Sequence, residues 1–585
     1  MPEQTEKKMT GYPSIDKPWL KYYSQDIIDM PLPNSTLYEV IYNNNQDNLD
    51  RTAIEYYGTN LSYGEMLHTI ALLAGDLEAS GIKEGDFVTV SMINSPETIC
   101  LLFALNKIGA VANMVYGTST LQELKKYILD TNTKVIFTLD LYQDKYAQIA
   151  SETGIRQIIV TSLSRSMSSD DRKALGDLGC AQKALPNDRR FITWEQFFSN
   201  NKESNFTFDC PDAPAVVTYT GGTTGGSKGA IFSSRSILSV SCQYITCTKN
   251  LTRNSTWALT LPLFTAFGTT WSLMIPFLVG MTVIVRLPLM ESITDLCNKF
   301  HANHIMHGPA YWEKLADDDA ELNLSSLFTP FTAGDFLPPA IENKINTYLK
   351  KCGCPSNIIN AYGLTEACTG VCSNFQYAHK EGSVGIPFCK NTIAAFDIEN
   401  NKELPYEREG ELCVITPSAM IGYVNNHVET NNILRHHNDG NVWIHTGDLG
   451  YIDKDGFVYI SGRLKRYMNC VSSGVHKKVF SLDIEKVLLH HSFVEKCAVV
   501  PVNNPETLQA PVSFIVLQKR VPDNNTAERE LTKYVEENLD SIYRPIKFFF
   551  VDSFPLTKLG KVDYRALEEI AAKNMNLTLA HRHVS

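Results

Sequence analysis

Short runs of β-branched residues alternate with helical stretches along this chain from about residue 50 onward. The run Phe87–Met92 (FVTVSM) is followed by a helical stretch at Pro96–Ile108, and the runs Lys134–Thr138 (KVIFT) and Gln157–Thr161 (QIIVT) enclose another. Strands and helices that alternate in this way form βαβ units, because two parallel strands need a long crossover connection. The chain is therefore predicted to be an α/β protein built on doubly wound, mostly parallel sheets.

The pattern changes after about residue 380, where helical stretches become rare. Strands such as Gly410–Thr416 and Phe457–Ser461 dominate this region. They predict a β-rich subdomain over about residues 380–462, which closes a large N-terminal domain of residues 1–462.

The remaining residues, 463–585, have a mixed pattern. A helix is expected at Leu531–Leu539 and a strand at Lys547–Val551. Because helical and strand patterns are both present in a short stretch, we expect a small α+β C-terminal domain.

One stretch, residues 255–285, contains no charged residue and is longer than the roughly 20 residues that span a bilayer. It nevertheless holds two prolines and two glycines, and its ends have the pattern of strands at Trp257–Leu261 and Met281–Leu287. We interpret it as a strand, a loop, a helix and a strand in a protein core rather than as a transmembrane segment.

Composition excludes several classes of protein. With 44% hydrophobic and 20% charged residues the chain is globular, and a net charge of -11 without a dense Lys/Arg run argues against nucleic acid as a partner. Fourteen cysteines without a Cys-x-x-Cys pair favour a reducing compartment, and the first ten residues lack the apolar core of a signal peptide. We expect a cytoplasmic protein.

A glycine-rich loop follows directly on an apolar strand at Val216–Gly229 (VVTYTGGTTGGSKG). Glycines let successive backbone N–H groups turn toward one centre, hydroxyls add donors, and Lys228 adds a full charge, so the loop suits a polyphosphate. The GTPase-type pattern does not fit, because Ser227 separates Gly226 from Lys228. The structural alternative is a flexible surface turn.

Five segments in this order resemble the signatures of the ANL superfamily of adenylate-forming enzymes, over about residues 50–567. The glycine-rich loop resembles the phosphate-binding signature, and Asn360–Glu366 (NAYGLTE) the second one. Thr446–Asp448 (TGD), Gly462–Lys465 (GRLK) and Pro555–Lys561 (PLTKLGK) resemble the remaining three. The resemblance implies an AMP-forming acid–thiol ligase, which converts a carboxylic acid and ATP into acyl-AMP and pyrophosphate and then forms a thioester.

The resemblance also implies four catalytic residues. The carboxylate must attack the α-phosphorus of ATP, so the site must neutralise phosphate charge and hold an in-line geometry. Thr365 would bond the α-phosphate, and Glu366 would hold Mg²⁺, which prefers hard oxygen ligands. Lys228 would bind the phosphates, and Lys561 would stabilise the charge that develops during adenylation.

A larger set of residues is expected to bind the nucleotide. Tyr362 would stack on adenine, Asp448 would accept both ribose hydroxyls, and Arg463 would lie near the ribose and phosphate. Taken singly, Asp448 is equally an ordinary turn residue, Tyr362 a core residue and Glu366 a charge at a helix N-terminus. The full expected set is Thr220, Gly221, Gly222, Thr223, Thr224, Gly225, Lys228, Gly334, Asn360, Ala361, Tyr362, Gly363, Thr365, Asp448, Arg463 and Lys561.

Lys465 is the expected hinge, about which a mobile C-terminal domain would bring Lys561 in and out. The segment Leu261–Gly268 (LPLFTAFG) has no carboxylate that would pair with an α-amine, so amino acid substrates are disfavoured. An apolar pocket suits a fatty or aryl acid. It is expected from Phe264, Phe267, Trp271 and His307.

Several positions depart from the family pattern. Ser227 replaces a common proline, Thr265 a common histidine, and Arg466 follows the hinge lysine where an acidic or neutral residue is usual. The segment 467–481 is longer than usual, and Ser481 replaces a proline.

Coenzyme A is the expected thiol acceptor, with ATP and Mg²⁺ as the other cofactors. A carrier-protein arm as acceptor, or a nucleotide-binding regulatory protein without activity, are the alternatives.

Overall fold

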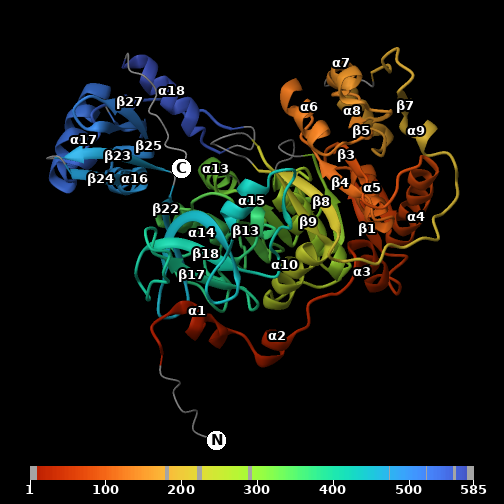
Figure 1. Ribbon diagram of the computed structural model, residues 1–585, viewed down its shortest axis with the longest axis horizontal. Helices are drawn as coiled ribbons and strands as arrows, with labels where there is room; N and C mark the ends of the chain where they lie inside the picture. Colours follow the sequence, from red (N-terminus) through yellow and green to blue (C-terminus); the bar gives the residue numbers. More distant parts are fainter. Residues whose placement is uncertain are drawn as a thin grey trace, which may run out of the picture.

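The computed structural model describes residues 9–177, 183–220, 227–287, 293–319, 321–464, 466–472, 475–521, 523–557 and 561–575. In this part of the chain, two large mixed sheets and an antiparallel sheet are followed by a separate group of helices and strands at the C-terminal end. Figure 1 shows that group, in blue, set to one side of the larger part. The arrangement confirms the predicted α/β class.

The first large sheet is parallel at its centre and antiparallel at one edge, in the order β19-β9-β8-β4-β3-β5-β6-β7. Sequence explains where the helix Pro96–Lys107 begins. Ser95 accepts a hydrogen bond from Thr98 N–H, and Pro96 occupies a first-turn position that needs no N–H donor. Three of its strands were predicted from their sequences to within one residue, at 87–92, 134–138 and 157–161. The strands are β3 (Phe87–Ser91), β4 (Val111–Met114), β5 (Val135–Leu139), β6 (Gln157–Thr161), β7 (Phe191–Thr193), β8 (Pro214–Tyr219), β9 (Gly229–Ser233) and β19 (Gly422–Tyr423), and the helices between them include α5 (Pro96–Lys107), α6 (Leu121–Asp130) and α7 (Gln143–Thr153).

The second large sheet has the order β16-β15-β14-β13-β12-β10-β11-β1-β2 and is parallel from β14 to β1. Its strands are β1 (Thr52–Tyr56), β2 (Thr59–Ser62), β10 (Thr256–Leu259), β11 (Thr282–Val285), β12 (His304–His307), β13 (Thr329–Thr332), β14 (Ile359–Tyr362), β15 (Cys372–Ser373) and β16 (Ile386–Pro387). One hydrophobic core joins this sheet to the first, and buried tryptophans such as Trp257 and Trp271 belong to it.

The uncharged stretch at 255–285 lies in this shared core. It consists of β10, the π-helical turn η2 (Phe267–Leu273), the helix α11 (Met274–Val279) and β11, as the sequence predicted. No helix within the described residues combines the length and apolar character that a membrane crossing requires. Most of the stretch is buried, so the absence of charge reflects its place in the protein core.

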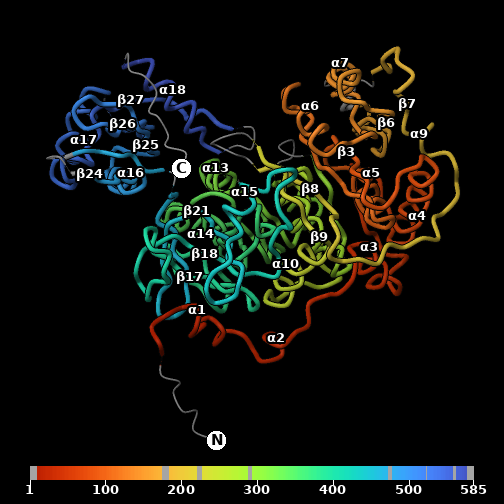
Figure 2. The backbone as a smooth tube through the Cα atoms, in the orientation of Figure 1, coloured from red at the N-terminus to blue at the C-terminus, as the bar shows by residue number. Residues whose placement is uncertain are grey.

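A segment near the N-terminus ties the larger part together. Figure 2 shows it in red, running from α1 (Pro13–Asp16) past α2 (Gln25–Asp29) beneath the other elements. Ser14 bonds Glu403, and Tyr23 donates to the carbonyl of Pro387 at 2.8 Å. The segment thus connects the second sheet with the antiparallel sheet.

The antiparallel sheet contains β17 (Thr392–Phe396), β18 (Gly410–Ile415), β20 (Leu434–His436), β21 (Val442–Ile452) and β22 (Val458–Arg463). The sequence predicted a β-rich region at this place, and the strands extend from residue 392 to residue 463. The last of these strands, β22, ends at Arg463, the residue at which the C-terminal domain was predicted to begin.

The C-terminal part packs helices on short sheets. It contains β23 (Tyr467–Ser472), β24 (Val475–Phe480), α16 (Ser481–Leu489), β25 (Val494–Asn504), β26 (Leu508–Leu517), α17 (Asn524–Asn538), β27 (Phe548–Phe550) and α18 (Tyr564–Asn574). The expected start of α17 at Leu531 was wrong by seven residues. Asp523 accepts a hydrogen bond from Thr526 N–H at 2.8 Å and begins the helix there, although its first turns are polar and lack an apolar stripe.

Candidate active site

The glycine-rich loop leaves the end of β8 and returns through β9, its antiparallel neighbour. Its base is closed by Thr220 and Lys228: Thr220 N–H donates to the Lys228 carbonyl at 2.9 Å, and Lys228 N–H donates to Thr220 Oγ1 at 3.1 Å. Ser227 Oγ also donates to the Thr220 carbonyl. The predicted residues Gly221, Gly222, Thr223, Thr224 and Gly225 lie outside the described residues.

The Lys228 ammonium points to residues that are far away in sequence. It forms an ion pair with Glu429 on α15 (His427–Ile433) and lies 5.0 Å from the centre of the Tyr423 ring. Tyr423 is in β19, the edge strand that pairs with β9, so the sheet itself brings these groups to the loop. The Glu429 carboxylate thus positions the Lys228 ammonium, and a bound phosphate would compete with Glu429 for it.

The chain makes a tight turn after β14, within the segment Asn360–Glu366 that resembles the second family signature. A Cβ atom on Gly363 would lie 1.0 Å from the Thr369 carbonyl oxygen, so glycine alone fits there. Thr369 N–H donates to the Leu364 carbonyl at 2.9 Å and closes the turn. This turn presents Thr365 and Glu366 at the carboxyl edge of the second sheet, where open α/β sheets bind their ligands.

Glu366 and Lys228 converge on the same aromatic ring. The Tyr423 hydroxyl donates to Glu366 Oε1, while Lys228 lies against the face of that ring. Met420 N–H holds the Glu366 backbone at 2.8 Å. Burial and the neighbouring carboxylate raise the pKa of Tyr423, so its hydroxyl stays a donor. The expected metal ligand and the expected phosphate-binding lysine therefore lie beside each other.

Asp448 is a buried carboxylate with two strong partners. Arg463 Nε forms an ion pair with its Oδ1 at 2.7 Å, and the Tyr362 hydroxyl donates to its Oδ2 at 2.5 Å. Burial raises the pKa of Asp448 and Arg463 opposes that rise, while Asp448 raises the pKa of Arg463. A carboxylate offers about four acceptor positions, so two remain for the hydroxyls of a ribose.

Asn360 and Gly334, from the expected nucleotide-binding set, lie in β14 and just after its neighbour β13. Thr332 at the end of β13 pairs with Asn360 in β14, so the two chain segments run side by side at the carboxyl edge. Gly334 has a φ of +93°, and a Cβ atom added to it would meet no other atom within 4 Å, so this backbone is accessible. Asn360 and Ala361 are buried in the strand itself.

Lys561 enters this region from the C-terminal part. Its backbone is fixed by Thr557, whose N–H donates to the Lys561 carbonyl at 2.7 Å. The carboxylates of Asp335 and Asp448 lie within electrostatic reach of its ammonium, as does Arg463. Surrounding protein lowers the pKa of Lys561 by desolvation, although the side chain keeps contact with solvent, and the two carboxylates counteract this. Lys561 is thus within electrostatic reach of the Asp448–Arg463 pair.

Of the four expected pocket residues, Phe264, Phe267 and Trp271 belong to one hydrophobic core, and His307 is not part of it. Phe267 and Trp271 share the turn η2 and pack on Phe331, at 6.2 and 5.1 Å between ring centres. Phe264 instead stacks on Tyr116 at 4.2 Å, and His307 stacks on Tyr311 at 3.8 Å. Burial lowers the pKa of His307 to about 4, which leaves its ring neutral at physiological pH. All four present apolar or uncharged rings.

Lys465, the predicted hinge, lies outside the described residues, but the contacts of the next residue, Arg466, are described. Arg466, the departure from the family pattern, pairs with Glu485 of α16 at 2.5 Å and lies 3.7 Å above the ring of Tyr564 in α18. Glu485 also accepts a hydrogen bond from Val499 N–H at 2.7 Å. Arg466 is therefore attached to the body of the C-terminal part.

We expect Arg466→Met to lower the free energy of unfolding of the C-terminal part by about 3 kcal/mol, because it leaves the buried Glu485 carboxylate without its cation. Urea denaturation followed by the near-UV signal of the tyrosines measures this. Arg466→Met combined with Glu485→Gln should lose much less than the sum of the two single changes. Strictly additive losses would contradict the inferred pairing.

Sequence reasoning missed three groups. Tyr423 and Glu429 contact residues 57 and 201 positions away, and Asp335 faces a lysine of the other domain. No local pattern marks them, because each belongs to a segment that tertiary structure alone places at the site.

Two family models match most of this chain. The family model "AMP-binding enzyme" matches residues 41–424, and "AMP-binding enzyme C-terminal domain" matches residues 483–561. With its two wound sheets and small C-terminal part, the protein is an adenylate-forming enzyme of the ANL superfamily. The chain belongs to the AMP-binding enzyme family.

Individual relatives extend over nearly the whole chain. A long-chain-fatty-acid–CoA ligase of Bacillus subtilis is 28% identical over 96% of this chain and 99% of its own. A 4-coumarate–CoA ligase of Humulus lupulus is 24% identical over 86% of this chain and 88% of its own. Among solved structures, ATP-bound MatB from Rhodopseudomonas palustris has a TM-score of 0.78 at 24% identity, covering 92% of this chain and 99% of that one. An anthranilate CoA ligase with bound anthranoyl-AMP has a TM-score of 0.77 at 20% identity, covering 94% and 100%. These two structures share the fold.

Proposed function

We propose that the protein is an ATP-dependent ligase that activates a fatty or aryl carboxylic acid as its acyl-adenylate and transfers the acyl group to coenzyme A. One observation supports this most directly: Lys561 of the C-terminal part lies within electrostatic reach of Asp448 and Arg463 of the larger part, which form an ion pair with each other. A module that only binds a nucleotide does not need a lysine delivered by a second domain. The CoA ligases among its relatives support the choice of acceptor.

In the proposed reaction, the chain binds and orients ATP while the acid attacks. Asp448 accepts the ribose hydroxyls, and Lys228 exchanges Glu429 for the phosphates. Lys561 is within electrostatic reach of Asp448, and it stabilises the charge that develops between the carboxylate of the substrate acid and the α-phosphate. Thr365, in the turn beside Glu366, donates to a phosphate oxygen.

The Glu366 carboxylate fits Mg²⁺, because its oxygens are hard ligands and one of them is held by a neutral hydroxyl rather than by a cation. When bound, Mg²⁺ would neutralise phosphate charge. Glu366 would hold it, and Tyr423 would orient Glu366. No other residue is assigned to the metal.

Pyrophosphate release over a panel of acids, with and without coenzyme A, tests the proposed function. Release that depends on a fatty or aryl acid, followed by thioester formation only with coenzyme A, supports it. If a thioester forms only on a carrier protein, the acceptor is that carrier protein and not coenzyme A. This alternative rests on the segment that departs from the family pattern, which contains the strands β23 and β24. We also propose a cytoplasmic location, which the free cysteines of the described residues support.

Acids with a free α-amine should be poor substrates. The aromatic rings of Phe264, Phe267 and Trp271 offer no charge for an ammonium, and an ion without a partner costs several kcal/mol to bury. Phenylalanine and 3-phenylpropanoate form a matched pair, since they differ only in this amine. We expect pyrophosphate release at least about 100-fold faster with 3-phenylpropanoate. Equal rates would show that the pocket contains a carboxylate partner.

A further inference from the structure

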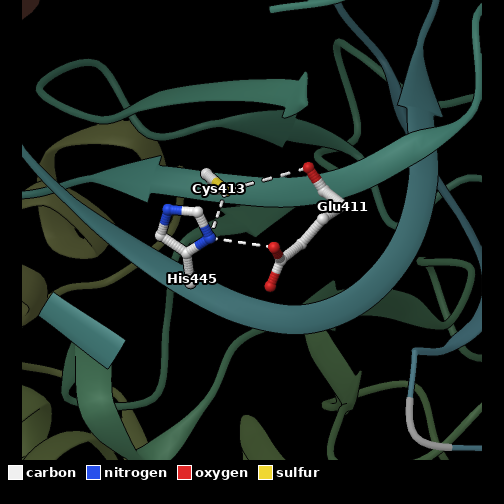
Figure 3. A group of neighbouring side chains, drawn as sticks. All are labelled: Glu411, Cys413 and His445. Carbon is white, nitrogen blue, oxygen red and sulfur yellow. Dashed lines mark hydrogen bonds and ion pairs between the residues drawn. The ribbon is translucent and has the colours of Figure 1, made fainter. Parts of the chain in front are cut away.

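A buried group of three side chains lies behind the predicted ribose-binding segment. Figure 3 shows Glu411 and Cys413 from β18 with His445 from β21. The two strands are antiparallel neighbours, and Cys413 pairs directly with His445. His445 immediately precedes the Thr446–Gly447–Asp448 segment, so this group is next to the nucleotide site.

The Thr446–Asp448 segment is a bulge in the ladder between the two strands. Glu411 pairs with Leu449 and Cys413 with His445, so three residues of β21 face a single residue of β18. Gly447 has a φ of +68° within this bulge. A bulge of this kind interrupts the regular ladder, and its backbone groups need other partners.

Glu411 supplies that partner. Its Oε1 accepts a hydrogen bond from Gly447 N–H at 3.0 Å, and its Oε2 accepts one from His445 Nδ1–H at 2.8 Å. His445 is 1% exposed, so its ring has one fixed orientation against the carboxylate. One side chain therefore supports both ends of the turn that leads into Asp448.

The remaining contacts of the bulge lead to the nucleotide site and to the hinge. Thr446 Oγ1 donates to the Leu412 carbonyl at 2.6 Å and accepts from Asp448 N–H at 3.0 Å. The Gly447 carbonyl accepts from Leu464 N–H at 2.7 Å, directly before the expected hinge. A displacement of Gly447 would therefore also move Asp448, because the two residues are adjacent in the chain.

The ligand atoms of Glu411, Cys413 and His445 lie within 4.8 Å of one another, as in a metal site. Hydrogen bonds account for the group more simply. Glu411 uses both oxygens, and His445 Nε2 lies 2.9 Å from His437 Nε2, so both ring nitrogens of His445 have partners. Burial raises the pKa of the Cys413 thiol, which opposes the thiolate that a metal would need.

We propose that Glu411 is a positioning residue of the nucleotide site: its carboxylate, oriented by His445, supports the bulge of residues 446–448 and thereby sets where the Asp448 carboxylate meets the ribose. The inference rests on the proposed function, in which Asp448 binds the ribose hydroxyls. Glu411 does not contact the substrate itself. Its effect should therefore appear in the recognition of ribose rather than in chemistry.

Glu411→Gln tests the proposal, because glutamine keeps the size of the side chain but sets an NH₂ donor against one of the two N–H donors. We expect the KM for ATP to rise about 10-fold with kcat within about twofold of wild type. The preference for ATP over 2′-deoxy-ATP should fall by a similar factor, since a displaced Asp448 no longer distinguishes the 2′-hydroxyl. Cys413→Ala, from the same buried group, is the matched control and should leave both quantities unchanged.

Asp448→Ala separates failure of this inference from failure of the proposed function. If Asp448→Ala abolishes the preference for ATP but Glu411→Gln does not change it, the positioning role of Glu411 is wrong. If Asp448→Ala also keeps the preference, the assigned ribose site is wrong. Stoichiometric zinc in the purified protein, lost in Cys413→Ala, would show a metal site instead. If Glu411→Gln does not fold, Glu411→Asp keeps the charge and should show the same loss of preference to a smaller degree, and an unchanged preference there overturns the proposal.

Discussion

Replacing Lys561 by alanine is expected to slow acyl-adenylate formation by about 10²- to 10³-fold, because a cation aimed at developing charge is among the largest single contributions to catalysis. Lys561 lies within electrostatic reach of Asp448 and Arg463 in the orientation described here. The second half-reaction does not involve charge at the α-phosphate in the same way. Thioester formation from supplied acyl-AMP and coenzyme A should therefore be almost unaffected.

The two half-reactions are measured separately, by pyrophosphate release in a single turnover and by thioester yield from acyl-AMP. Lys573→Ala removes an exposed lysine from α18 in the same domain and should change neither. An equal loss of both half-reactions in Lys561→Ala would mean that the C-terminal domain does not alternate between two positions. The predicted hinge at Lys465 would then be wrong.

Replacing Glu366 by glutamine is expected to reduce adenylation at limiting Mg²⁺ by about 10- to 150-fold, which corresponds to the loss of one charged interaction. The Mg²⁺ concentration for half-maximal velocity should rise, because an amide oxygen is a weaker ligand for a hard cation than a carboxylate. Titration of adenylation velocity with Mg²⁺ measures both effects.

Tyr423→Phe is the matched control for this prediction. It removes the hydroxyl that donates to Glu366 but keeps the ring against which Lys228 lies. We expect a small change in the Mg²⁺ requirement from Tyr423→Phe and a large one from Glu366→Gln. Should Glu366→Gln show an unchanged Mg²⁺ dependence, Glu366 is not the ligand and serves only to anchor the turn after β14.

Local sequence was sufficient for β3, β5 and β6 of the first sheet. Runs such as Gln157–Thr161 are bounded by turns and rich in β-branched residues, and the strand β6 has those bounds. It was not sufficient for α17, because the polar turns after Asp523 carry no apolar periodicity and depend on a cap. The sequence therefore predicts such a helix only from the point at which apolar residues begin to recur with helical spacing.

The candidate site divides along the same line. Lys228, Glu366, Asp448 and Lys561 were predicted because the short motifs that contain them resemble family signatures. Their partners were not found. The pairing of β19 with β9 decides that Glu429 and Tyr423 meet Lys228. Orientation of the C-terminal part decides that Asp335 faces Lys561.

The sequence by itself determined the α/β class, the order of the motifs and the chemical type of each group, because these follow from periodicity and from residues that are neighbours along the chain. Tertiary structure decided which charges meet. Glu411 is the clearest case: nothing near residue 411 marks it, yet the bulge at Gly447, 36 residues away, leaves a backbone N–H that its carboxylate satisfies. A backbone donor displaced from its ladder must find a partner in three dimensions, and sequence distance does not limit that search.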